Sequence, residues 1–70
     1  MMPLSMVSEG EKNIIKKVGG REDVRRFLES LGFVVGGDVT VVSKNGGNVI
    51  VNVKASRIAV SQEMANRIMV

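Results

Sequence analysis

The sequence contains no cysteine and no histidine among its 70 residues. Without cysteine, the chain can form no disulfide, no thiolate metal site and no cysteine nucleophile. Without histidine, it lacks the side chain that most often acts as a general base or binds a metal ion. The seven acidic residues form no compact ligand set along the chain. We therefore expect no enzyme activity, no catalytic residue, no cofactor and no high-affinity metal site.

Aromatic residues are also scarce, with two Phe and neither Tyr nor Trp. Recognition of proline-rich peptides requires an aromatic-lined groove, and binding of single-stranded nucleic acid uses stacked aromatic rings. The glycine pairs at 36–37 and 46–47 lack the lysine-serine ending of a phosphate-binding loop. The sequence disfavours all three kinds of binding.

The chain has no apolar run near the roughly 18 residues that a membrane-spanning helix needs. Its first ten residues combine neither a basic start nor an apolar stretch of the kind that signal peptides carry. We therefore expect a cytoplasmic protein that does not itself span a membrane.

Charge is modestly positive, with a formal net charge of +3 and a sequence pI of about 9.8. Residues 1–35 carry six cations and five acids, and residues 36–70 carry four cations and two acids. The two signs are interleaved, and no strong block of one sign exists. A small nucleic-acid-binding barrel therefore stays open as an alternative, but we do not expect a nucleic-acid partner.

The residues that are present predict one compact domain spanning 1–70, because 44% of them are hydrophobic. The clearest helix follows Gly20, where Val24, Phe27, Leu28 and Leu31 form one apolar stripe that we expect to pack in the core. Two i,i+4 ion pairs, Glu22 with Arg26 and Arg25 with Glu29, are expected on its exposed side. Gly32 is predicted to end this helix in the left-handed conformation, with Phe33 folding back onto Leu28.

Around this helix the pattern is mainly β. We predict about five short antiparallel strands, at residues 11–18, 38–43, 49–54, 57–60 and 68–70, with a bend inside the first. A helical turn is expected at Leu4 to Val7 and another at Gln62 to Arg67. Val34 to Gly37 is predicted to form a turn with a positive φ at Gly36. Strands this short suggest an α+β fold built on a closed or nearly closed barrel without exposed edges.

The order of these residues resembles the ferrous iron transport protein A (FeoA) family. The matching residues are Leu4, Val7 and Gly10; Ile15, Val18 and Gly20; Leu28, Leu31, Gly32, Phe33 and Gly36; Val39 and Val41; Val49, Val51 and Val53; Arg57-Ile58-Ala59-Val60; and Glu63, Ala65, Ile68 and Val70. The chain departs from the family pattern at Val35 and Asn48, where proline is usual, and at Ala55, where glycine is common.

The resemblance implies an SH3-like small β-barrel and an accessory role in bacterial ferrous iron uptake. The implied partner is FeoB, a large membrane transporter with a cytoplasmic GTP-binding domain. An SH3-like domain of an iron-dependent repressor stays open as a second possibility, because such domains resemble the same family.

Candidate partner-binding residues are of two kinds. The first kind is apolar residues on predicted outer faces or at the tip of the helix-to-strand link, and the second is the cations of the helix. They are Ile14, Val34, Val35, Val42 and Ile50, together with Arg21, Arg25 and Arg26. Isolated exposed apolar residues do not indicate a binding site, whereas a cluster of them marks an interface. The sequence leaves open whether these residues cluster.

Overall fold

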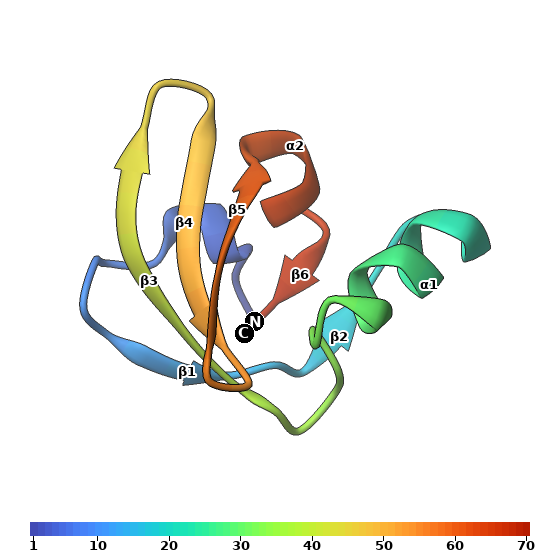
Figure 1. Ribbon diagram of the computed structural model, residues 1–70. Helices are drawn as coiled ribbons and strands as arrows, with labels where there is room; N and C mark the ends of the chain where they lie inside the picture. Colours follow the sequence, from blue (N-terminus) through green and yellow to red (C-terminus); the bar gives the residue numbers. More distant parts are fainter.

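The computed structural model describes residues 1–70 as a small barrel with one longer helix at its side (Figure 1). In chain order the elements are a 3₁₀ helix Leu4–Met6, β1 Lys12–Ile14, β2 Lys17–Val18, α1 Glu22–Ser30, β3 Asp38–Asn45, β4 Asn48–Val53, β5 Ser56–Ser61, α2 Gln62–Ala65 and β6 Ile68–Met69. The mainly β prediction with one main helix is confirmed.

The strands form two antiparallel sheets, one in the order β1-β3-β4-β5 and one pairing β2 with β6. The first predicted strand is therefore two strands in different sheets, and the count is six. The expected bend lies at Ile15 and Lys16. The Ile15 N–H donates to Gly37 on one side (2.9 Å), and the next N–H, of Lys16, donates to Met69 on the other (2.8 Å). This corner turns the chain from one sheet to the next.

The core lies between the sheets and consists of 15 buried hydrophobic residues, to which every strand except β1 contributes. Strand β4 shows how it forms, since Val49, Val51 and Val53 alternate inward as their spacing predicts. The 3₁₀ helix buries Leu4, and α2 buries Ala65, as expected of both helical turns. The Ser61 hydroxyl caps α2 by accepting a hydrogen bond from the Met64 N–H (3.1 Å).

The end of α1 forms the predicted cap. The Gly32 N–H donates to Glu29 (3.0 Å) and the Phe33 N–H donates to Leu28 (3.1 Å), which is the double hydrogen bond of a Schellman motif. Gly32 has a φ of +111°, which side-chain-bearing residues rarely adopt. Leu28 and Phe33 are both fully buried. The cap therefore anchors the helix to the core.

The rest of the apolar stripe of α1 does not pack as expected. Leu28 alone is buried, Val24 and Leu31 are half-buried, and Phe27 is 51% exposed. The prediction that Phe27 belongs to the core is wrong. The helix touches the barrel along one side of its stripe and turns the other side to solvent, and Figure 1 shows α1 standing beside the barrel.

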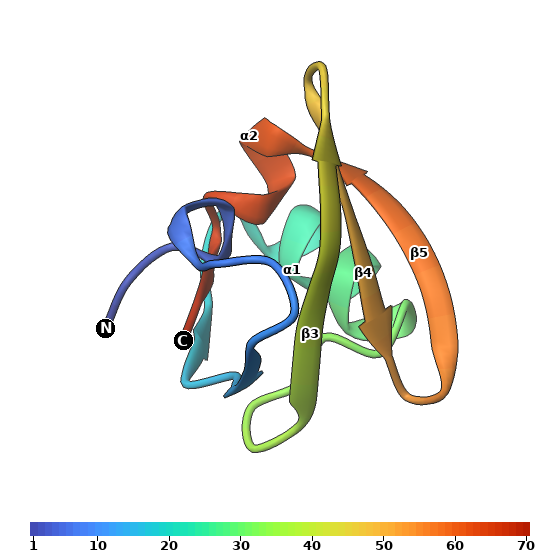
Figure 2. The ribbon, with the colours of Figure 1, turned by 90° about the vertical axis from the view of Figure 1, so that its left-hand side faces the viewer.

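The barrel is nearly closed rather than closed, and the outer side of β5 is one of its free edges. Strand β5 pairs with β4 on one side and with no strand on the other. Figure 2 shows β5 as the outermost strand of the sheet. The two termini, in contrast, are paired. The Met2 N–H donates to Val70 and the Val70 N–H donates to Met2, each at 2.9 Å, so the ends of the chain lie side by side.

Candidate docking surfaces

The turn between α1 and β3 presents an apolar tip. The Gly37 N–H donates to the Val34 carbonyl (2.9 Å), which closes a turn that has Val35 and Gly36 at its centre. Gly36 has a φ of +88°, as predicted for this turn. Val34 is half-buried, whereas Val35 is 66% exposed. The turn therefore holds the Val35 side chain out into solvent.

Ile14 lies at the same end of the molecule. Its neighbour Ile15 accepts a hydrogen bond from the Gly36 N–H (2.8 Å), which joins β1 to the turn. Ile14 is 47% exposed and pairs in register with Asp38, whose carboxylate forms an ion pair with Lys12 (3.1 Å). We call Ile14, Val34 and Val35 the turn-end patch. Both ribbon views place the end of β1 beside this turn (Figures 1 and 2).

Val42 and Ile50 lie elsewhere, on the outer face of the larger sheet. The register between β3 and β4 shifts from Val41 opposite Val51 to Ser43 opposite Ile50, so Val42 forms a bulge. Both side chains are half-buried, and Ile50 pairs in register with Ala59 of β5. These two residues therefore form a pair that is separate from the turn-end patch.

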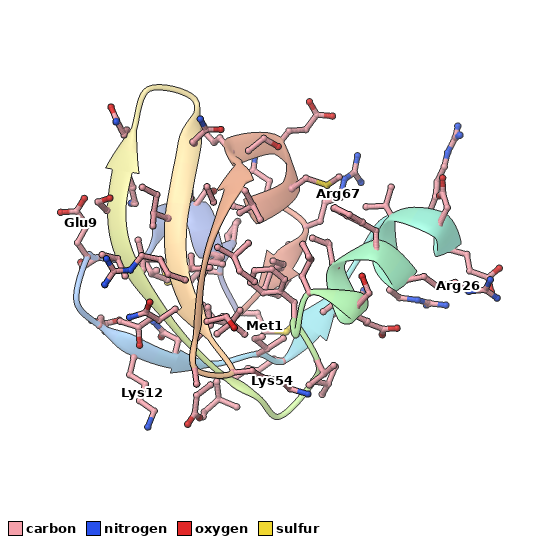
Figure 3. The ribbon with its side chains drawn as sticks, in the orientation of Figure 1. Met1, Glu9, Lys12, Arg26, Lys54 and Arg67 are labelled. Carbon is pink, nitrogen blue, oxygen red and sulfur yellow. The ribbon has the colours of Figure 1, made fainter.

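The three candidate arginines lie on or just before α1, away from both apolar groups. Arg26 forms the predicted ion pair with Glu22 (2.8 Å) and points away from the barrel at the far end of the helix (Figure 3). The predicted pair between Arg25 and Glu29 does not form. Arg25 and Arg21 are therefore free to meet an acidic partner. Exposed pairs of this kind contribute little to stability.

Phe27 is the candidate residue that sequence reasoning missed. It lies between Asp23 and Ser30 on the helix surface, four residues after the first and three before the second. These polar neighbours place Phe27 at the margin of the apolar stripe. Their position is the sequence feature from which its exposure could have been predicted. The Ser30 hydroxyl donates to the Phe27 carbonyl (2.6 Å). An exposed phenyl ring on a regular helix is a typical interface residue.

A shallow pocket of about 380 Å³ was also missed. Seven residues line it: Met1, Lys17, Gly19, Gly20, Asn66, Arg67 and Met69. Its two charged side chains are both cations, and neither forms an ion pair. A Cβ at Gly20 would come within 3.0 Å of the Arg67 side chain, so glycine keeps this side of the pocket open. The pocket adds positive charge to the surface beside α1.

No group of three or more His, Cys, Asp or Glu side chains comes together to hold a metal ion. No polar or charged residue is buried, and every buried side-chain nitrogen or oxygen atom has a partner. None of the helices is long and apolar enough to cross a membrane. The surface of the molecule carries exposed apolar side chains, cations without ion pairs and free strand edges, among them the outer edge of β5.

Comparison with known proteins gives consistent results. Residues 2–70 match the FeoA domain. A protein of Methanocaldococcus jannaschii named as an Fe(2+) transport protein A is 36% identical over 70 residues, which span all of this chain and 85% of that protein. FeoA of Stenotrophomonas maltophilia, described as a procaryotic SH3 domain protein and solved with zinc, is 28% identical. It has a TM-score of 0.86, with 99% of this chain and 88% of that chain covered.

A manganese-dependent transcriptional repressor shares the fold as well, with a TM-score of 0.85 at 14% identity. The match covers 94% of this chain but only 38% of the repressor chain. At that level of identity the likeness concerns the fold alone. The SH3-like architecture predicted from the sequence is confirmed.

Proposed function

The chain belongs to the FeoA domain family, and on that premise we propose that it is a non-enzymatic accessory protein of ferrous iron uptake. In this proposal it acts in the cytoplasm as one domain, by binding the cytoplasmic part of an FeoB-type membrane transporter. The bound protein then modulates iron transport or nucleotide turnover by the transporter.

The observation that carries this proposal is the exposure of large apolar side chains on rigid elements. Val35, Phe27 and Ile14 are 66%, 51% and 47% exposed on a tight turn, a capped helix and a strand. In a chain this short, most apolar side chains are needed to bury a sufficient core. Apolar side chains that stay outside it are therefore available to a partner, and their rigid supports limit the entropy lost on binding.

Charge supports the same proposal. Arg21 and Arg25, at the start of the helix that carries the exposed Phe27, are free of ion pairs, and the chain carries a net charge of +3. A partner surface with acidic groups around an apolar centre would be complementary to this helix. Complementary charge of this kind mainly raises the rate of association and fixes the orientation of the complex.

The test is calorimetric titration of the protein with the purified cytoplasmic part of its cognate transporter, with and without guanine nucleotide. We expect Val35→Ser and Phe27→Ser each to weaken binding at least tenfold, because each removes a large apolar contact. Met6→Ser is the matched control, since Met6 is 67% exposed on a different element. A measured absence of any complex would refute the proposed function. Equal loss with Met6→Ser would refute the proposed surface.

A regulatory role adds a second readout. We expect the GTP hydrolysis rate of the transporter to change when the protein is added, and to change less with Val35→Ser. Retention of the protein on DNA or RNA that weakens steeply as salt rises would instead favour the nucleic-acid alternative. The repressor-domain alternative is supported by the fold alone.

A further inference from the structure

Strand β5 carries backbone groups that nothing in the molecule uses. Its register with β4 is unbroken from Ser56 to Ser61, so the strand is regular along its whole length. Edge strands are usually protected by charged side chains, proline, bulges or a covering element, because an open edge can pair with another chain. Strand β5 has neither proline nor bulge, its one charged side chain is Arg57, and no strand pairs with its outer edge (Figure 2).

One hydrogen bond shows which backbone N–H and C=O groups of β5 point toward β4 and which point outward. The Gln62 N–H donates to the Gly47 carbonyl (2.8 Å), so the register position formed by these two residues is a hydrogen-bonded pair. In an antiparallel ladder, hydrogen-bonded pairs alternate with non-hydrogen-bonded pairs. Val60 and Ile58 therefore direct their N–H and C=O groups to β4, while Ala59 and Arg57 direct theirs outward. Neither Ala59 nor Arg57 has a backbone partner outside the ladder.

The side chains of β5 define what could lie against it. Ile58 faces the core side next to Val60, yet it stays half-buried because no strand covers it at the edge. Arg57 and Ala59 lie on the outer face of the sheet and are exposed. A strand added beside β5 would place alternate side chains on these two faces. The complementary segment is therefore apolar on the face beside Ile58 and polar on the face beside Arg57.

Charge identifies the polar residues of that segment as acidic. Lys54, in the turn before β5, and Arg57, within it, form no ion pair. The Arg57 side chain has only a long hydrogen bond to the Asn52 amide (3.4 Å). A second copy of this chain would bring the same cations to the shared edge, where like charges repel. A foreign segment with acidic residues on its outer face meets no such repulsion.

We propose that β5 accepts an extended segment of the partner as an added β-strand, with acidic side chains outside and apolar ones inside. The inference rests on the proposed function and names the structural mode of docking. The Arg57 and Ala59 backbone groups supply the hydrogen bonds, and Ile58 and Arg57 supply the side-chain selectivity. This is the general pattern of peptide recognition by strand addition.

Amide hydrogen exchange followed by NMR tests the proposal directly. In the free protein, the Arg57 and Ala59 amides should exchange fast, because they face solvent, whereas Ile58 and Val60 should be protected by the ladder. Addition of the cytoplasmic part of the transporter should slow exchange at Arg57 and Ala59 at least tenfold. A complex that forms while these two amides still exchange at their free rates would overturn the inference and leave the proposed function standing.

A second arm does not depend on the transporter. The labelled protein is titrated with a synthetic peptide of alternating glutamate and valine, and with its counterpart of alternating lysine and valine. The glutamate peptide should shift and protect the Arg57 and Ala59 amides, and the lysine peptide should not. Equal effects of both peptides, or no effect of either, would overturn the inference even if the transporter binds elsewhere.

Variants at Ala59 complete the test. Ala59→Pro removes an outward donor that the fold does not use, and should weaken partner binding at least tenfold. If Ala59→Pro fails to fold, the pair Ala59→Glu and Ala59→Lys replaces it. The glutamate should weaken binding to an acidic segment more than the lysine does. The reverse order, or a dimer of the free protein with a protected Ala59 amide, would contradict the proposed occupant.

Discussion

The turn between β4 and β5 makes a sharp prediction about stability. Lys54 and Ala55 connect the strands with φ values of 48° and 61°, the only positive φ values outside glycine in the chain. Two consecutive positive φ values are what a two-residue type I′ hairpin requires, and such turns favour glycine at the second position. The family pattern commonly has glycine where this chain has Ala55. The structure supplies the reason, because Ala55 holds a Cβ in a conformation where it is strained.

The magnitude follows from two opposing contributions. A left-handed conformation costs a side-chain-bearing residue about 1–2 kcal/mol. Replacement by glycine removes that cost, but it adds about 0.5–1 kcal/mol of conformational entropy to the unfolded chain. The difference between these two ranges is about 0–1.5 kcal/mol, and we expect Ala55→Gly to raise the free energy of unfolding by a value in its middle, about 0.5–1 kcal/mol. Lys54 is less suitable for replacement by glycine, because its side chain packs over Gly32. A Cβ built at Gly32 would lie 3.4 Å from that side chain.

The assay is urea denaturation followed by circular dichroism, supported by thermal melts. For a domain of this size, the expected gain corresponds to a rise in Tm of about 2–8 °C. Ala59→Gly is the matched control, because it makes the same chemical change at an exposed strand residue without a positive φ. It should lower stability by about 0.5–1 kcal/mol. If both variants lose stability alike, Ala55 carries no strain and the reasoning is wrong.

Other variants test the helix cap, the core and the surface charge. Gly32→Ala should destabilise the fold by about 1–2 kcal/mol in urea denaturation, because alanine cannot easily adopt the cap conformation. Phe33→Ala should cost about 3–5 kcal/mol and leave the protein partly unfolded at 25 °C, visible as a broadened circular dichroism transition. Glu22→Gln should change stability by less than about 0.5 kcal/mol and abolish the small salt dependence of its exposed pair with Arg26. A loss of stability above about 1 kcal/mol in Glu22→Gln would show that this ion pair contributes more than exposed pairs do.

A metal-binding experiment tests the sequence-based expectation about iron. We expect the protein to retain no stoichiometric Fe(II) after anaerobic desalting, measured by mass spectrometry of the metal content. Stoichiometric retention would contradict that expectation.

Local features could be predicted from the sequence, because the residues that decide them are neighbours in the chain. The Gly32–Phe33 cap needs only the helix before it, and the turn at Gly36 needs only its own four residues. The alternation of Val49, Val51 and Val53 likewise fixes their inward face once the strand forms. Each of these predictions depends on spacing within about ten residues.

Features that depend on packing between distant segments could not be predicted. The helix pattern gives an apolar stripe, but the side of it that meets the barrel depends on where α1 is anchored, so Phe27 was misplaced. Closure of the barrel depends on pairing across the whole chain, so the free edge of β5 was missed. Among the candidate residues, the sequence gives no distances, and the structure separates Ile14 and Val35 from Ile50.

The pairing of Met2 with Val70 has a practical consequence. Because Met2 and Val70 are hydrogen-bonded to each other, the chain begins and ends at the same place in the fold. It can therefore be placed within a surface loop of a carrier protein without stretching either chain. For the same reason, the ends can be joined by a few glycines and new ends opened at the Gly46–Gly47 hairpin. A circularly permuted protein of this design would carry its ends, and any tag attached to them, at the tip of the β3–β4 hairpin.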